Sequence, residues 1–196
     1  STKQDFLEGV DSMALTNQQI ENIQIDYGIV YVNYGVNGQQ LLGPTRGGGE
    51  FVATATIRDI EYDGSKGKTK GMQVVDDITA QLNVTSLNAS MDTLKMALPF
   101  AKYTASPGKL SVGSDSVGII PDSAYLENIT MFAKTVNGKY KKITLYNALS
   151  ENGLTLAAAP KAEGTIALNV YAHWDAIDDT KKLFEIEDVE SIGQGG

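Results

Sequence analysis

The sequence predicts a mainly β protein: a β-sandwich or barrel with one short α-helix packed against it and long loops. Apolar and polar residues alternate with period two in several segments, a pattern typical of strands with one buried face. Asn137-Gly138 separates two such segments, and this dipeptide favours a tight hairpin turn. Only one segment has the spacing of an amphipathic helix, so the helix is expected to pack against strands.

The clearest strand is expected at residues 78–87. One set of alternating positions is apolar, and the other set is polar and uncharged. The apolar set is Ile78, Ala80, Leu82 and Val84, and the polar set is Thr79, Gln81, Asn83 and Thr85. This pattern indicates a strand that packs on a core on one side and meets water on the other.

Two earlier segments are also expected to be strands. Residues 20–33 place Ile23, Ile25, Tyr27, Ile29 and Tyr31 on one face. Residues 50–62 place Phe51, Ala53, Ala55 and Ile57 in phase, and the parity then changes. A bulge near Arg58 and Asp59 would account for this change, because one extra residue exchanges the two faces.

The second half predicts a hairpin and a last long strand. Residues 125–136 and 140–145 form the hairpin around Asn137-Gly138, and residues 164–174 form the last strand. The helix is expected to begin after Ser90, which can cap it, and to end at Pro99. Its apolar stripe is Met91, Leu94 and Leu98.

The remaining segments are expected to be loops and arms. Residues 34–49 and 64–71 are interrupted by glycine, and residues 105–121 are rich in Ser, Gly and Pro. The predicted strands lie between residues 20 and 174, which we expect to form one β domain. We expect an N-terminal arm at 1–19 and an acidic C-terminal arm at 175–196 whose end is disordered.

Composition argues against several classes of function. The chain has no cysteine, one histidine and a net charge of −8, which disfavours thiol chemistry, His-rich metal sites and tight DNA binding. No apolar run is long enough to cross a membrane, so no membrane partner is expected. No cofactor is expected either.

The candidate chemical motifs favour structural interpretations. Residues 46–49 (RGGG) lack the pattern of a phosphate-binding loop, and Asp76-Asp77 and Asp178-Asp179 do not fit a calcium loop. His173 comes without the sequence context of a catalytic serine. We therefore expect no catalytic residue, no metal ligand and no enzyme.

Two stretches resemble siphophage major tail tube proteins. The first is LLGPTRGGGEFVATATIRDIEYDGSKGKTKGMQVVDDITAQLNVTSLNASMDTLKMALP, with a Gly-rich lead-in, a strand, a basic Gly loop, a second strand and a short helix. The second is ENITMFAKTVNGKYKKITLYNALSENGLTLAAAPKAEGTIALNVYAHWD, with a charged hairpin and a late strand that ends in an aromatic-rich segment.

The resemblance implies a virion protein of the phage tail, assembled in the cytoplasm of the host bacterium. Such subunits form rings, usually hexamers, that stack into a hollow tube. Their partners are further copies of themselves, the tape measure, tail tip and terminator proteins. Double-stranded DNA passes through the lumen without specific binding and is ejected into the host cell. The alternative is a carbohydrate-binding or adhesion module, for which Tyr27, Tyr31 and Tyr34 are the nearest aromatic cluster.

Three sets of residues follow as candidate surfaces. Thr79, Gln81, Asn83 and Thr85 are predicted to face the lumen. A basic loop, Lys66, Lys68 and Lys70 with Arg46, is predicted to contact the neighbouring ring. Its predicted acidic complement is Asp178, Asp179, Glu185, Glu187, Asp188 and Glu190.

Overall fold

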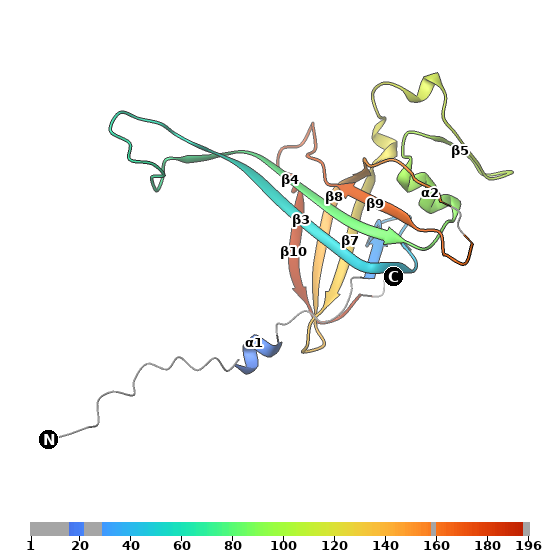
Figure 1. The fold of residues 1–196 in the computed structure, drawn as a ribbon, viewed down its shortest axis with the longest axis horizontal. Coiled ribbons are helices and arrows are strands. Elements are labelled where there is room, and N and C mark those ends of the chain that lie inside the picture. The colour runs from blue at the N-terminus through green and yellow to red at the C-terminus, as the bar shows by residue number, and fades with distance from the viewer. Residues whose placement is uncertain (1–15, 22–28, 158–159, 194–196) are drawn as a thin grey trace.

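A computed structural model describes residues 16–21, 29–157 and 160–193 of the chain (Figure 1). The helices are α1 (Asn17–Glu21) and α2 (Met91–Ala97), with 3-10 turns at Ser114–Ser116 and Asp122–Ala124. The strands are β1 (Ile29–Val32), β2 (Gln40–Leu41), β3 (Thr45–Asp59), β4 (Gln73–Ser86), β5 (Lys102–Thr104), β6 (Lys109–Ser111), β7 (Leu126–Lys134), β8 (Tyr140–Ser150), β9 (Ile166–Tyr171) and β10 (Phe184–Val189). The predicted fold class, mainly β with one short helix packed against the strands, is confirmed.

Eight strands form one sheet that folds over itself into two layers. Its order is β2-β1-β7-β8-β9-β4-β3, and β10 pairs with β8. The first half of β8 pairs with β10 and its last two residues pair with β9, so the sheet turns a corner within this strand. The corner lies at Asn147, whose φ of 48° is left-handed. In Figure 1, β3, β4 and β9 accordingly cross over β7, β8 and β10.

The core lies between these two layers. Leu82 and Leu168 from one layer and Ile129 and Leu145 from the other have no exposed surface. The two layers approach closely at Gly49, where an added Cβ would lie 2.6 Å from the Met131 sulfur. A glycine at this position therefore lets β3 pack directly on β7.

β4 and α2 agree with the sequence prediction. Ala80, Leu82 and Val84 are buried on one face of β4, whereas Thr79 on the other face is exposed. The Ser90 hydroxyl accepts a hydrogen bond from the Thr93 amide at 3.4 Å and caps α2. Leu94 and Met96 pack against the core, so the helix covers one end of the sandwich.

The predicted strand at residues 20–33 is confirmed at its end, where Ile29 and Tyr31 share one face, but that face is not the core face. Ile20 and Glu21 belong to α1, and β1 begins only at Ile29. Val30 and Val32 are the buried side chains of β1, whereas Tyr31 packs on the outer face against the rings of Tyr34 and Phe132. Apolar residues therefore occupy both faces of this strand, and alternation could not identify the core face. Ile23, Ile25 and Tyr27 lie outside the described residues.

The predicted bulge exists, but it lies on the partner strand. Thr56 pairs with Asp77 and Ile57 pairs with Val75, so the extra residue is Asp76 in β4. The predicted position near Arg58 and Asp59 in β3 was wrong, although the Arg58 side chain binds Asp76 at 3.0 Å.

The predicted acidic arm at 175–196 contains β10, a strand of the main sheet. Phe184–Val189 pairs with Tyr140–Leu145 of β8 in antiparallel register. Phe184 packs against Phe51 with 5.2 Å between the ring centroids, which ties β10 to the opposite layer. The charges of this segment obscured a short alternating pattern. The predicted disordered end at residues 194–196 lies outside the part of the chain that the structure describes.

β3 and β4 extend far beyond the rest of the sheet. β9 pairs with β4 only from Gln81 to Ser86, so the distal half of the β3–β4 hairpin has no third strand. Figure 1 shows this hairpin projecting away from the body of the molecule. Within the described segments, no helix has the length and apolar character needed to cross a bilayer.

Candidate functional site

The projecting hairpin presents an apolar face to solvent. Phe51 and Leu82 are paired on the core side of the hairpin, and the same side continues outward through Ala53, Ala55 and Ile78 to Ile57 and Val75. Ile57 is 55% exposed and Val75 54% exposed. We call Ala53, Ala55, Ile57, Val75 and Ile78 the ribbon face. It continues the core surface of the protein beyond the point where the opposite layer ends.

Polar contacts hold the hairpin in shape along its length. The Arg58 guanidinium donates to the Asp76 carboxylate across the bulge. Farther out, Lys68 and Gln73 donate to Asp59 at 2.9 and 2.8 Å. These two hydrogen bonds, led by that from Lys68, lower the pKa of Asp59. The Ile60 amide then donates to the Met72 carbonyl at 2.8 Å, which keeps the two strands together up to the turn.

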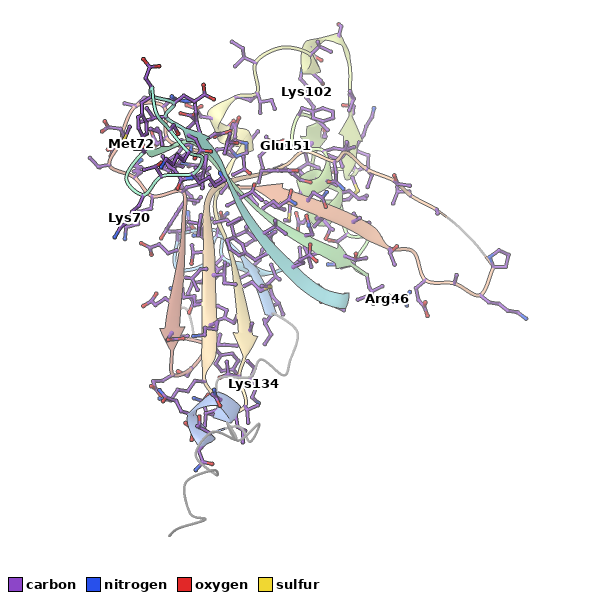
Figure 2. The ribbon with its side chains drawn as sticks, turned by 60° about the vertical axis from the view of Figure 1, so that its left-hand side comes forward. Arg46, Lys70, Met72, Lys102, Lys134 and Glu151 are labelled. Carbon is purple, nitrogen blue, oxygen red and sulfur yellow. The ribbon has the colours of Figure 1, made fainter. Side chains whose placement is uncertain are left out.

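The residues of the predicted basic loop do not all lie together. Lys66, Lys68 and Lys70 lie in the hairpin end, residues 60–72, whereas Arg46 lies at the opposite end of β3 (Figure 2). Arg46 binds Glu163 at 2.7 Å. At about 3.3 Å per residue, the strand separates Arg46 from the hairpin end by roughly 40 Å. Arg46 therefore belongs to a different surface of the subunit.

The hairpin end is also less basic than its lysines suggested. Glu61 and Asp63 precede the turn, whereas Lys66 and Lys70 follow it, and Lys68 is paired with Asp59. Within the described residues, Lys66 and Lys70 form no ion pair. The charges of the hairpin end are therefore separated between its outgoing and returning arms, a feature that counting only its lysines overlooked.

Most of the predicted acidic complement is already paired within the subunit. Glu187, Asp188 and Glu190 bind lysines of the β7–β8 hairpin, and Glu185 binds Lys182. The partners of the first three are Lys142, Lys141 and Lys139 respectively. Asp178 instead accepts hydrogen bonds from the Thr180 hydroxyl and amide, which lower its pKa. Asp179 is exposed in the same loop. The structure brings β10 next to β8, and these opposite charges meet there.

The predicted lumen residues share a broad polar face with two neighbouring strands. Thr79 and Thr54 hydroxyls lie 2.6 Å apart, and the Asn83 amide donates to Glu50 at 3.3 Å. The register aligns Gln81 with Val52 and Tyr171, and Asn83 with Glu50 and Asn169. We call this the polar face, and its polar residues are Thr79, Gln81, Asn83, Thr85, Glu50, Thr54 and Asn169. Val52, Tyr171 and Arg46 lie on the same side, opposite Gln81 and Thr85. The contributions of β3 and β9 were not predicted, since only the pairing register reveals them.

His173 has a structural environment at the corner of the sheet. Its Nδ1 lies 2.8 Å from the Asn147 carbonyl oxygen, and its Nε2 lies 2.9 Å from a Glu151 carboxylate oxygen. The Tyr125 ring packs edge-on at 5.2 Å. Both ring nitrogens therefore contact groups that hold β8, β9 and the following loop together.

The other candidate motifs have structural surroundings as well. Residues 46–49 lie at the start of β3, where Gly47 and Gly48 are extra residues relative to β4. Asp76 binds Arg58. Tyr31 and Tyr34, the aromatic cluster of the adhesion alternative, pack edge-on against Phe132. Tyr27 lies outside the described residues.

Comparison with known proteins identifies neighbours by structure alone. No family model matches the chain, and no curated protein sequence matches it. A chain of the "virion of native gene transfer agent (GTA) particle" covers 83% of this chain and 96% of its own length, with 8% identity and a TM-score of 0.42. A chain of the "tail of empty GTA particle", determined with C6 symmetry, covers 76% and 92%, with 10% identity and a TM-score of 0.44.

A third neighbour is the crystal structure of Hcp protein. It covers 70% of this chain and 74% of its own length, with 15% identity and a TM-score of 0.27. All three TM-scores lie below 0.5.

Proposed function

We propose that this chain is a non-enzymatic tail tube subunit of a phage-type particle, and that its copies join into rings that stack into a hollow conduit for DNA. The resemblance of its sequence to siphophage tail tube proteins supports this role. It also supports rings of six subunits, a place in the virion and assembly in the host cytoplasm. The tape measure, tail tip and terminator proteins are the further partners that this role implies.

The observation that carries the proposal is the ribbon face. A two-stranded β-ribbon is marginally stable in water, and this one also exposes a row of apolar side chains. Burying that row under a second subunit would remove the apolar area from water, at about 25 cal/mol per Å². The projecting hairpin is therefore an element that becomes fully packed only in an assembly.

The free edge of β3 supports the same conclusion. β3 ends the strand order of the sheet, and it is 15 residues long. A long edge presents unpaired backbone groups to other chains, and closed rings remove such edges. A head-to-tail contact that closes gives a ring, which fits a subunit whose hairpin projects on one side only.

The polar face is suited to line the channel. It carries hydroxyl and amide side chains together with Glu50, and Asp77 continues it toward the hairpin end. DNA binds proteins mainly where lysine and arginine neutralise its phosphates and release counterions. The one cation aligned with this face is Arg46, opposite Thr85, and its charge is paired with Glu163. A lining of this composition offers DNA few such contacts, so DNA would slide through without specific binding.

Light scattering and negative-stain microscopy of matched variants test the proposal. Ile57→Asp with Val75→Asp places two charges on the ribbon face, and Val112→Asp, at a similarly exposed position outside it (57%), is the control. We expect the ribbon variant to remain monomeric, because the charges would have to be buried on assembly. We expect the control to assemble like the unmodified protein. Normal assembly of a folded ribbon variant would contradict the proposal.

A further inference from the structure

A groove lies on the body of the subunit between residues 119–127 and 173–181. Its volume is about 530 Å³, and Ile119, Tyr125, Trp174 and Ile177 contribute its apolar lining. Ile119 is fully exposed and Ile177 is 95% exposed. Two neighbouring loops therefore display large apolar side chains around one cavity.

Hydrogen bonds fix the loop that displays Trp174 and Ile177. The Asp175 carboxylate accepts from Lys181 at 2.9 Å and from the Ile177 and Asp178 amides at 2.9 and 3.0 Å. These bonds, led by that from Lys181, lower the pKa of Asp175 to about 2. His173 anchors the start of the loop through Asn147 and Glu151. The backbone of the loop is therefore held in place, which lowers the entropic cost of binding a partner.

The groove is acidic. Asp122, Glu127 and Asp175 line it, and the one lysine in its lining, Lys181, is paired with Asp175. Asp122 and Glu127 form no ion pair with any other described residue. A partner for this groove should therefore combine apolar side chains with unpaired cations.

The two arms of the hairpin end together have this chemistry. Lys66 and Lys70 are unpaired among the described residues, and Tyr62 on the facing arm is 45% exposed. The hairpin end projects away from the body, so it cannot reach the groove of its own subunit (Figure 1). It extends about ten residues beyond Ala53, or roughly 30 Å, which is enough to cross onto a neighbouring copy.

We propose that the hairpin end of one copy, with the lysines of its returning arm foremost, seats in the groove between residues 119–127 and 173–181 of a neighbouring copy. Lys66 and Lys70 meet Asp122 and Glu127, and Tyr62 packs on the apolar lining. This contact rests on the proposed self-assembly and specifies its receiving surface. It replaces β10, whose acidic side chains are paired within the subunit, as the complement of these lysines.

A charge exchange tests the contact. Lys66→Glu with Lys70→Glu reverses the hairpin end, Asp122→Lys with Glu127→Lys reverses the groove, and Lys109→Glu is a control at an exposed lysine of β6. We expect each reversal alone to raise the concentration needed for assembly by about tenfold, a modest change because exposed ion pairs are weak. Combining the two reversals should restore assembly, and the control should change nothing.

Cross-linking tests the same contact by proximity, with only the charge of Lys66 removed. Because the chain has no cysteine, Lys66→Cys combined with Ile177→Cys gives two unique attachment points for a short bismaleimide. We expect the double variant to form a ladder of covalent oligomers, each single variant to stop at dimers, and Lys66→Cys with Lys109→Cys to form no ladder. Assembly without the ladder and without charge rescue would overturn this contact alone. An unmodified protein that never assembles would overturn the proposed function as well.

Discussion

A single carboxylate, that of Asp175, organises the loop that carries the only tryptophan of the chain. It accepts three hydrogen bonds, from one side chain and two backbone amides. Each of these bonds favours the ionised form, which is why the pKa lies near 2 in the folded protein. The usual value for an unfolded aspartate is about 3.9.

The loop should therefore respond to acid in a defined pH window. Since the folded pKa is the lower one, ionised Asp175 stabilises the fold above about pH 4. This contribution is lost as the pH falls toward the folded pKa of about 2. We expect the fluorescence of Trp174 to be constant from pH 7 to about 4 and to change below that.

Asp175→Ala should show the altered fluorescence already at pH 7. Asp179→Ala, in the same loop but exposed, is the matched control and should behave like the unmodified protein. Identical emission of the Asp175 variant and the unmodified protein at pH 7 would show that this carboxylate does not position Trp174.

At the scale of elements, β10 joins the two layers of the fold. Its main link is the contact between Phe184 and Phe51, and Phe51 also begins the apolar side of the hairpin. We expect Phe184→Ala to lower the free energy of unfolding by about 2 kcal/mol, less than for a fully buried phenylalanine. Chemical denaturation measures this change.

A double-mutant cycle separates the contact between the two rings from the loss of buried apolar area at each ring. Phe184→Ala and Phe51→Ala should together cost less than the sum of the single changes, with a coupling of about 1 kcal/mol. Strict additivity would mean that β10 is held by its pairing with β8 and not by the opposite layer.

α2 offers a second test at this scale. Ser90→Ala removes the side-chain acceptor that caps the helix and should cost about 1 kcal/mol. Ser111→Ala, in exposed β6, is the control. An equal thermal midpoint for both variants would show that the cap is not needed to hold α2 on the core.

Prediction from the sequence succeeded for elements that have only one apolar face. β4, β9 and α2 each have one buried side and one solvent-facing side. Alternation of apolar and polar residues located the two strands, and helical spacing located α2. Alternation misjudged β1, because Tyr31 packs with other rings on the outer face. It did not predict β10, because three of the six residues of this strand are charged. Pairing partners supply that information, and a single sequence does not contain them.

The candidate functional surfaces were less predictable from the sequence than the strands and the helix. The polar face of β4 follows from its own residues, but its extension to Glu50 and Asn169 depends on register. The lysines of the hairpin end were located, whereas their separation from Arg46 and the pairing of Glu187, Asp188 and Glu190 depend on tertiary contacts. The groove at Trp174 combines loops that are distant in sequence, and no local pattern indicates it.

For the whole molecule, the placement of the polar face determines how a tube would treat DNA. Gln81→Lys with Asn83→Lys adds cations to that face, so assembled tubes should retain short DNA at low salt and release it as salt rises. Ser111→Lys, on exposed β6, is the control and should not retain DNA inside the tubes. Filter retention of labelled DNA measures the difference. Equal retention by both variants would place the polar face outside the channel.

End-on class averages of the assembled, unmodified protein test the central claim most directly. The protein is concentrated stepwise and imaged by negative-stain microscopy, with light scattering of the same samples. The proposed function predicts closed rings with an open centre and, at higher concentration, tubes built from those rings. A chain that stays monomeric at every concentration, or that forms only solid or open filaments, would contradict it.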